Sequence, residues 1–181
     1  MSALFTWGAA LLMFAFPLVG GEDAMEPTSS EEHCVVTVID QKVDGELVMS
    51  DPDCYPTFSE AISVASKGST VLAADADGSV LFEDQAIAVA ASNFTLGVHF
   101  DGYNGTGSSV TVVGSSCSGG YWNATGFYDR INSSYNGCTR LKHYDDWDAS
   151  DYLTYTYGVG TTDNLSSSTA NRTNSVSYHS S

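Results

Sequence analysis

The chain has 181 residues, of which 43% are hydrophobic, and its formal charge is −16. This apolar content is enough for a packed core and excludes a fully disordered chain, and the length allows one or two domains. Only 6 lysines and arginines stand against 22 acidic residues, so the field has the wrong sign for binding nucleic acid through its phosphates.

The acidic residues are concentrated in the front of the chain. Residues 22–92 contain 15 acids and 2 lysines, whereas residues 93–181 contain 7 acids and 4 basic residues. An acidic surface is typical of cation binding, of simple solvation or of adaptation to high salt. Salt adaptation should acidify the whole surface, so the uneven distribution argues against a salt-loving host.

An apolar run near the N-terminus predicts a secretory leader over residues 1–21. The run reads ALFTWGAALLMFAFPLV and is followed by two glycines. It lacks a preceding basic residue and a clean A-x-A cleavage site. It is short for a membrane span and contains Pro17, so we expect export without a stable membrane span. The polar residues 22–32 are expected to form a linker.

The four cysteines also favour an extracellular protein. They are Cys34, Cys54, Cys117 and Cys138, an even number without the C-x-x-C spacing of zinc or thioredoxin-like sites. Three pairings are possible. We prefer Cys34–Cys54 with Cys117–Cys138, because each bridge then stays within one module.

Residues 33–92 are expected to form a small acidic α+β module. The segment HCVVTVID is rich in β-branched residues and predicts a strand, and Asp44-Gly45 predicts a hairpin turn after it. In PTFSEAISVASKG, Thr57 and Glu60 form a capping box, and apolar residues at helical spacing predict a helix that stops at Gly68. We find no candidate chemistry in this module.

One acidic stretch in this module, DADGSVLFED, resembles part of an EF-hand calcium loop. Asp75, Asp77, Gly78 and Asp84 match its third, fifth, sixth and twelfth positions. The first position would be Ala73, and no clear second helix follows. An ordinary Asp-Gly turn is therefore the favoured interpretation.

The second half of the chain contains an internal repeat with a period near 43 residues. HFDGYNGTG begins at His99 and HYDDWDASD begins at His143, 44 residues later. YDRINSS and ANRTNSV carry Asp129 and Asn171, which are 42 residues apart. The same phrases thus recur in the same order, and two similar structural units are expected.

The expected fold class is mainly β. Short segments rich in Val, Tyr, Phe and Thr, broken by Gly and Asn, predict strands throughout residues 93–181. Four strands per unit predict two Greek keys, at about 93–138 and 139–181, that close into one β-sandwich. The hairpin and helix of the front module precede this sandwich.

The two units resemble those of βγ-crystallin domains, in which each Greek key opens with an aromatic-x-Gly corner. Tyr103-Asn104-Gly105 matches this corner in the first key, and Ser108 or Ser109 supplies its usual serine. Trp147-Asp148-Ala149 stands at the second corner, with alanine where glycine is usual. The arrangement is similar to secreted microbial proteins in which a short cysteine-paired module precedes the crystallin unit.

The resemblance implies calcium binding. Microbial βγ-crystallins carry a motif of two Asn/Asp, two variable residues, a Ser/Thr and a Ser, and YDRINS and ANRTNS occupy its place. Their second and last positions match the motif. The first positions are Tyr128 and Ala170, and the fifth are Asn132 and Asn174, which depart from it.

In this family the two motifs exchange ligands across the domain to form two sites. The resemblance therefore implies one site with Asp129 and Asn174, and another with Asn171 and Asn132. Backbone carbonyls would complete the sites, and they are those of Arg130, Arg172, Asp101 and Asp145. Oxygen ligands suit Ca²⁺, and one carboxylate among the side-chain ligands predicts weak affinity, on the order of 10⁻⁴ M. The alternative is that these loops are structural connections whose Asp and Asn bond their own backbone.

The expected function is extracellular calcium binding coupled to stability, since a ligand that binds only the folded state stabilises it. No enzymatic activity is predicted. The alternative on the same fold is an extracellular interaction protein with degenerate calcium loops, such as a protease inhibitor or an antimicrobial factor. The sequence identifies no protein or glycan partner for it. The many tyrosines, with Trp122 and Trp147, are interpreted more readily as sandwich core than as a carbohydrate- or protein-binding surface.

Two further features have less weight. His99 and His143 occupy equivalent positions, but a zinc pair without a third ligand is less favoured than two ordinary strand residues. N-x-S/T sequons predict surface glycosylation if the host modifies exported chains. They lie at Asn93, Asn104, Asn123, Asn132, Asn164 and Asn171. A glycan on Asn132 or Asn171 would compete with calcium, so both interpretations do not hold at one site.

Overall fold

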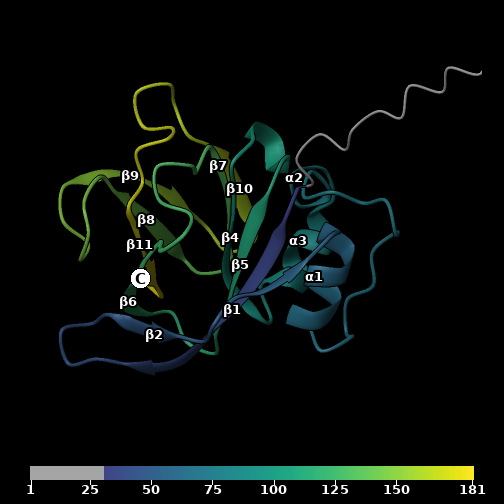
Figure 1. Ribbon diagram of the computed structural model, residues 1–181, viewed down its shortest axis with the longest axis horizontal. Coiled ribbons are helices and arrows are strands. Elements are labelled where there is room, and N and C mark those ends of the chain that lie inside the picture. The colour runs from purple at the N-terminus through teal and green to yellow at the C-terminus, as the bar shows by residue number, and fades with distance from the viewer. Residues whose placement is uncertain (1–30) are drawn as a thin grey trace, which may run out of the picture.

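A computed structural model describes residues 31–181. The chain forms two β-sheets and a group of short helices in three layers (Figure 1). A seven-stranded sheet lies in the middle, a four-stranded sheet covers one of its faces, and the helices cover the other. The mainly β class predicted from the sequence is confirmed. The predicted leader, and residues 22–30 of the predicted linker, lie outside the described residues.

The seven-stranded sheet combines strands from both halves of the chain. Its strands are β1 (His33–Gln41), β2 (Leu47–Met49), β3 (Asp53–Tyr55), β4 (Thr95–Phe100), β5 (Ser109–Val113), β7 (Ser133–Asn136) and β10 (Thr161–Asn164). The order is β10-β7-β4-β5-β1-β2, and β3 also pairs with β1. β1 runs parallel to β5. The front segment and the repeat region therefore share one sheet.

The four-stranded sheet belongs to the repeat region alone. Its order is β6-β11-β8-β9, and its strands are β6 (Ser118–Asn123), β8 (Arg140–Tyr144), β9 (Tyr152–Tyr157) and β11 (Ser175–His179). In each repeat unit the third strand leaves the other three. β6 departs from β4, β5 and β7, whereas β10 departs from β8, β9 and β11. The two units thus exchange one strand each.

The turn and the helix predicted in the front half form as expected. Gly45 adopts a φ of 96° in the turn between β1 and β2, a conformation that glycine adopts without strain. Thr57 caps α1 (Phe58–Ala65), because its hydroxyl accepts the amide of Glu60 at 3.3 Å. Its buried face consists of Phe58, Ala61, Ile62 and Ala65. Gly68 follows the helix with a φ of 77°.

The acidic stretch after this helix forms a turn and then two short helices. The carboxylate of Asp77 accepts the backbone amide two residues later at 3.0 Å. The helices are α2 (Val80–Glu83) and α3 (Gln85–Ala91), so the expectation that no helix follows is wrong. Both are too short to show periodicity, although Asp84 is a capping residue for α3. Within the described residues, no helix is long and apolar enough to cross a membrane.

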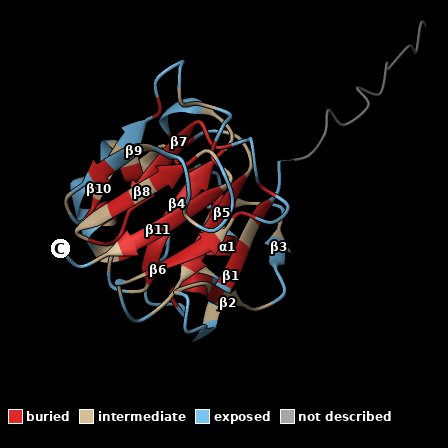
Figure 2. Ribbon diagram, turned by 90° about the vertical axis from the view of Figure 1, so that its left-hand side faces the viewer, coloured by how far each residue is buried: buried red, intermediate tan, exposed pale blue. Residues whose placement is uncertain are grey.

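Hydrophobic cores lie on both faces of the central sheet, and Figure 2 shows buried residues along most of its strands. The core between the sheets includes Leu96, Val112, Leu141, Val176 and Tyr178. The core under the helices includes Phe58, Ile62, Leu81, Phe100 and Tyr135. All six residues of β4 are buried, because this strand is covered on both faces.

Two disulfides join segments that are close in sequence. Cys34–Cys54 connects the paired strands β1 and β3, and Cys117–Cys138 connects the segment before β6 to the segment after β7. This is the nearest-neighbour connectivity, and no cysteine in the described part of the chain is free. Each bridge of this kind contributes about 2–4 kcal/mol, chiefly by restricting the unfolded chain.

Candidate functional site: two equivalent corners and loops

The two repeated phrases fold into two equivalent corners. The first corner, residues 101–108, follows β4, and the second corner, residues 145–151, follows β8. Each is closed by a backbone hydrogen bond between its ends, at 3.0 Å and 2.8 Å. Asn104 and Asp148 sit at matching places with φ of 56° and 58°, in the left-handed region that Asn and Asp tolerate best after glycine.

A serine from the following motif holds each corner. The hydroxyl of Ser133 donates to the carbonyl of Gly102 at 2.7 Å and accepts the amide of Gly105 at 3.1 Å. Ser175 makes the equivalent contacts in the second corner, at 2.6 Å and 3.1 Å. These serines are the last residues of the YDRINS and ANRTNS motifs. The motif match at this position therefore has a structural role.

The serines expected from the resemblance to serve the first corner face elsewhere. The hydroxyl of Ser108 accepts the backbone amide of Glu32 at 3.2 Å, and that of Ser109 lies 3.0 Å from Nδ1 of His33. Both serines therefore attach the front segment to the repeat region, in addition to the parallel pairing of β1 with β5.

The motif loops of the two repeat units lie against each other. The first loop comprises residues 128–132 and the second loop residues 170–174. In each, the second residue, Asp129 or Asn171, donates its backbone amide to the carbonyl of the fourth residue of the opposite loop, at 3.0 Å in both cases. The two motif loops are thus paired through their backbones across the two repeat units.

The candidate calcium site with Asn132 and Asn171 is called the first site below, and the site with Asp129 and Asn174 is called the second. The side chain of Asn132 contacts the other residues of the first site. Its Nδ2 lies 2.6 Å from the carbonyl oxygen of Asp101 and 3.1 Å from Oδ1 of Asn171. The side chain is only 8% exposed, and its Oδ1 is buried without a hydrogen-bond partner. Turning the amide by 180° would direct this oxygen toward the other two. Three oxygens would then face one point, which is a ligand set that suits Ca²⁺.

The second candidate site is less complete. Nδ2 of Asn174 lies 2.5 Å from the carbonyl oxygen of Asp145, which reproduces half of the arrangement at Asn132. Asp129, the predicted carboxylate ligand, is exposed, and among residues 31–181 its side chain makes no hydrogen bond. The structure therefore joins Asn174 to the carbonyl of Asp145 and leaves the carboxylate of Asp129 facing solvent.

Two arginines connect each loop to its corner. Arg130 forms an ion pair with Asp101 at 2.5 Å, and Arg172 forms the equivalent pair with Asp145. The sequence suggested these arginines only as backbone ligands, and the structure adds this role for their side chains. The pairs are solvent-exposed, so each contributes little to stability. Their main effect is to position the carbonyls of Asp101 and Asp145 beside the loops.

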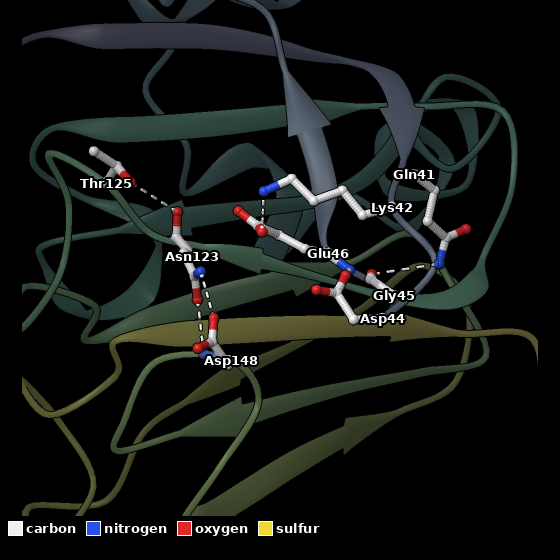
Figure 3. Close-up of polar contacts among 8 residues, drawn as sticks. All are labelled: Gln41, Lys42, Asp44, Gly45, Glu46, Asn123, Thr125 and Asp148. Carbon is white, nitrogen blue, oxygen red and sulfur yellow. Dashed lines mark hydrogen bonds and ion pairs between the residues drawn. The ribbon is translucent and has the colours of Figure 1, made fainter.

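Two asparagines that the sequence reasoning missed lock the corners from the opposite repeat unit. Asn164, at the end of β10, accepts the backbone amide of Asn104 at 2.7 Å and donates to its side chain at 2.5 Å. Asn123, at the end of β6, makes the same two contacts with Asp148, at 2.9 Å and 3.0 Å (Figure 3). The sequence feature that could have indicated their equivalent roles is a pair of N-x-S/T triplets 41 residues apart, close to the repeat period.

Replacing one of these asparagines should destabilise the whole domain. We expect Asn123→Ala to lower the free energy of unfolding by about 1–2 kcal/mol, because the amide and carboxylate of Asp148 lose their partner. Urea denaturation at neutral pH measures this change. Asn93→Ala is the matched control, since Asn93 is an exposed sequon asparagine outside both corners. Equal effects of the two substitutions would contradict the locking role.

The two histidines of the repeat meet between the sheets. His99 and His143 are both fully buried, and their ring centroids are 5.9 Å apart. The nitrogens of His99 contact the hydroxyls of Ser134 and Tyr178 at 2.9 Å and 3.0 Å, which leaves neither free for a metal. Burial lowers the pKa of His143 to about 3, and burial together with His143 lowers the pKa of His99 well below its usual range. They are core residues that stay neutral.

A pocket of about 560 Å³ lies next to the first loop, between the β1–β2 hairpin and β6. Its apolar lining includes Val36, Leu47, Met49, Val110, Trp122 and Phe127. Lys42, which pairs with Glu46 (Figure 3), is one of its lining residues. Arg130, which stacks on Phe127 and pairs with Asp101, is another. The volume is in the range of small-molecule sites, roughly 300–1,000 Å³. With both cations already paired, the pocket shows no preference for a charged ligand.

Comparisons of the chain with protein-family models, with curated proteins and with solved structures found no match. The functional assignment therefore depends on the corners and loops themselves. Their defining features are the near-identical geometry of the two units and the oxygen-rich contacts around Asn132.

Proposed function

We propose that the protein is an extracellular calcium-binding protein of the βγ-crystallin type, in which calcium joins two Greek keys and stabilises the fold. The strand topology supports this proposal, because each unit keeps three strands in one sheet and sends its third strand to the other. The two disulfides fit an oxidising, extracellular environment.

The arrangement at Asn132 is the observation that carries the proposal. Its amide nitrogen contacts two oxygens that come from the first corner and the second loop, while its own oxygen has no partner. A buried polar atom without a partner costs about 1–3 kcal/mol. A cation between the three oxygens would remove this cost and replace the bridging N–H group. The partnerless oxygen of Asn132, beside two further oxygens that a turned amide would face, is thus better explained by an ion than by the loop alone.

The two sites are expected to be weak and unequal. The Asp101 and Asp145 carboxylates are engaged by arginines, so they add little charge for an ion. Asp129 is the remaining carboxylate of the two loops and serves the second site. We expect dissociation constants on the order of 10⁻⁴ M, as in other extracellular calcium modules.

Calcium should therefore raise the stability of the full chain. At a calcium concentration about 100 times the dissociation constant, each site adds about 2.7 kcal/mol to the free energy of unfolding. Thermal and urea unfolding in 10 mM calcium and in EDTA, at low and at molar salt, measures this gain. We expect Asn171→Ala to remove the contribution of the first site and Asp129→Ala that of the second.

Asp75→Asn is the matched control, because Asp75 is an exposed acid of the EF-hand-like stretch and belongs to neither motif loop. This variant should keep the full calcium response. An equal free energy of unfolding in calcium and in EDTA would contradict the proposal, and the loops would then be structural connections. A response that survives Asn171→Ala and Asp129→Ala but disappears in Asp75→Asn would place the ion elsewhere.

A further inference from the structure

The outer face of the four-stranded sheet carries an unusual set of side chains for so acidic a protein. Side chains alternate along a strand, so the half-buried Arg140 and Lys142 of β8 face outward while Leu141 and His143 face the core. Figure 2 views the molecule from the side on which this sheet lies, with the exposed strand β9 at its margin. β9 is the edge strand, and nothing in the described part of the chain pairs with its far side.

The strand register places an aromatic ring beside each cation. Tyr157 of β9 lies opposite Arg140, and Tyr155 lies opposite Lys142. On the other side of β8, His179 of β11 lies opposite Arg140. Tyr155 and Tyr157 are 53% and 64% exposed, although large aromatic residues are usually buried. These five residues are referred to below as the tyrosine–cation face.

Of the other four basic residues, three are ion-paired, whereas Lys67, like the two cations of this face, has no acidic partner among the residues that the structure describes. The ion-paired basic residues are Lys42, Arg130 and Arg172. Arg140 and Lys142 have no carboxylate within ion-pair distance among residues 31–181. Nη2 of Arg140 donates to the backbone oxygen of Ser181 at 2.6 Å, and its Nε is buried without a partner. Arg140 is thus partly engaged by the main chain, and within residues 31–181 no side-chain carboxylate neutralises the charge of Arg140 or Lys142.

We propose that the tyrosine–cation face binds an acidic oligosaccharide. The guanidinium of Arg140 and the ammonium of Lys142 suit the carboxylates of uronic-acid units, since charge-assisted hydrogen bonds of this kind are strong. The rings of Tyr155 and Tyr157 offer rigid, flat contact area for the apolar faces of sugar rings, and their hydroxyls reach polar groups. This inference is independent of calcium binding at the loops.

Size and charge favour a sugar over other anionic partners. Four strands and five residues cover roughly 19 Å by 17 Å, which is well below the roughly 800 Å² that each partner of a stable protein complex buries. The total charge of −16 repels every anion, but the repulsion grows with the charge of the ligand, so a long polyphosphate such as nucleic acid is disfavoured more than a short chain with few carboxylates. A short acidic chain with flat rings fits both the area and the isolated pair of cations.

Isothermal titration of the full chain with an oligogalacturonate tests the proposal. The titration is done in EDTA, so that calcium at the loops takes no part in binding. We expect the acidic oligosaccharide to bind, the affinity to fall as salt rises, and a neutral malto-oligosaccharide of equal length to bind at least about tenfold more weakly, because it offers no carboxylate to the two cations.

Variants of the face locate the site. Arg140→Gln combined with Lys142→Gln should weaken binding about tenfold or more, because two charge-assisted contacts are lost. Tyr155→Ala combined with Tyr157→Ala should weaken it by a similar factor. Lys67→Gln is the matched control, since Lys67 is exposed and lies just beyond α1. Far-ultraviolet circular dichroism verifies that each variant is folded.

Three results would overturn the proposal. One is the absence of oligogalacturonate binding in low salt. Another is equal binding of the neutral sugar, or of a polyglutamate peptide with the same number of carboxylates, which would indicate a surface that does not recognise acidic sugars. The third is an equal loss of affinity in Lys67→Gln and in the Arg140/Lys142 variant, which would indicate a non-specific charge effect.

Discussion

The protein should unfold at a much lower urea concentration at pH 4.5 than at pH 7.5, because two buried histidines stay neutral in the folded state. Folding lowers the pKa of both His99 and His143. Below about pH 6.5 the unfolded chain therefore takes up two protons that the folded chain does not bind. Each histidine then removes about 1.4 kcal/mol of stability per pH unit, down to about pH 3 for His143.

This stability is complete above about pH 6.5 and is lost as the pH falls toward 3. At pH 4.5 His143 alone costs about 2.7 kcal/mol relative to neutral pH, and His99 adds a further loss in the same direction. Urea denaturation at several pH values measures the slope. Removing one histidine should reduce that slope by about half of the contribution of the pair.

Either His99→Gln or His143→Gln serves as the variant, whichever folds better at pH 7.5. His179→Gln is the control, because His179 is partly exposed and its pKa is lowered by burial and by the nearby Lys142 and Arg140. It should change the slope less than either buried histidine does. If the slopes of the wild type and the buried-histidine variants coincide, the acid sensitivity has another origin.

Gly105→Ala should be among the most destabilising single substitutions in the chain, with a loss of about 3 kcal/mol. A Cβ on Gly105 would lie 2.5 Å from the carbonyl oxygen of Gly78, a backbone atom that precedes α2. The φ of 78° adds left-handed strain for any residue with a side chain. Equilibrium unfolding at neutral pH measures the loss.

The opposite substitution in the second corner should have the opposite sign. Ala149 occupies the position equivalent to Gly105 and adopts a φ of 54°. Ala149→Gly relieves left-handed strain but raises the conformational entropy of the unfolded chain, and we expect the relief to exceed this cost, with a net stabilisation of about 0.5 kcal/mol. If Ala149→Gly destabilises the protein as strongly as Gly105→Ala, the two corners are not conformationally equivalent.

Much of the local structure was predictable because it depends on neighbouring residues. The capped helix after Thr57, the turn at Gly45 and the repeated corners each follow from short-range rules of capping, turn geometry and spacing. The short helices α2 and α3 were not predicted from the sequence, because segments of four and seven residues show too little hydrophobic periodicity to be distinguished from a loop. The mainly β class followed from composition and strand spacing.

Sequence reasoning named the residues of the candidate site, but it did not predict which side-chain atoms contact one another. The repeat singled out Asn132, Asn171 and Asp101, and the resemblance to βγ-crystallins suggested how they would be grouped. The partnerless Oδ1 of Asn132 depends on burial by segments more than thirty residues away, and no local pattern reports it. The locking role of Asn123 is equally non-local, because its partner belongs to the opposite repeat unit.

The order of residues decides which segments become strands, which residues repeat and which cysteines are close enough to pair, since these properties act over short distances along the chain. The folded arrangement alone decides that β1 joins β5 in one sheet, and that Trp122 is buried while Tyr155 and Tyr157 are exposed. The physical reason is that strand pairing and burial join residues far apart in sequence. Their free energy depends on which faces finally cover one another.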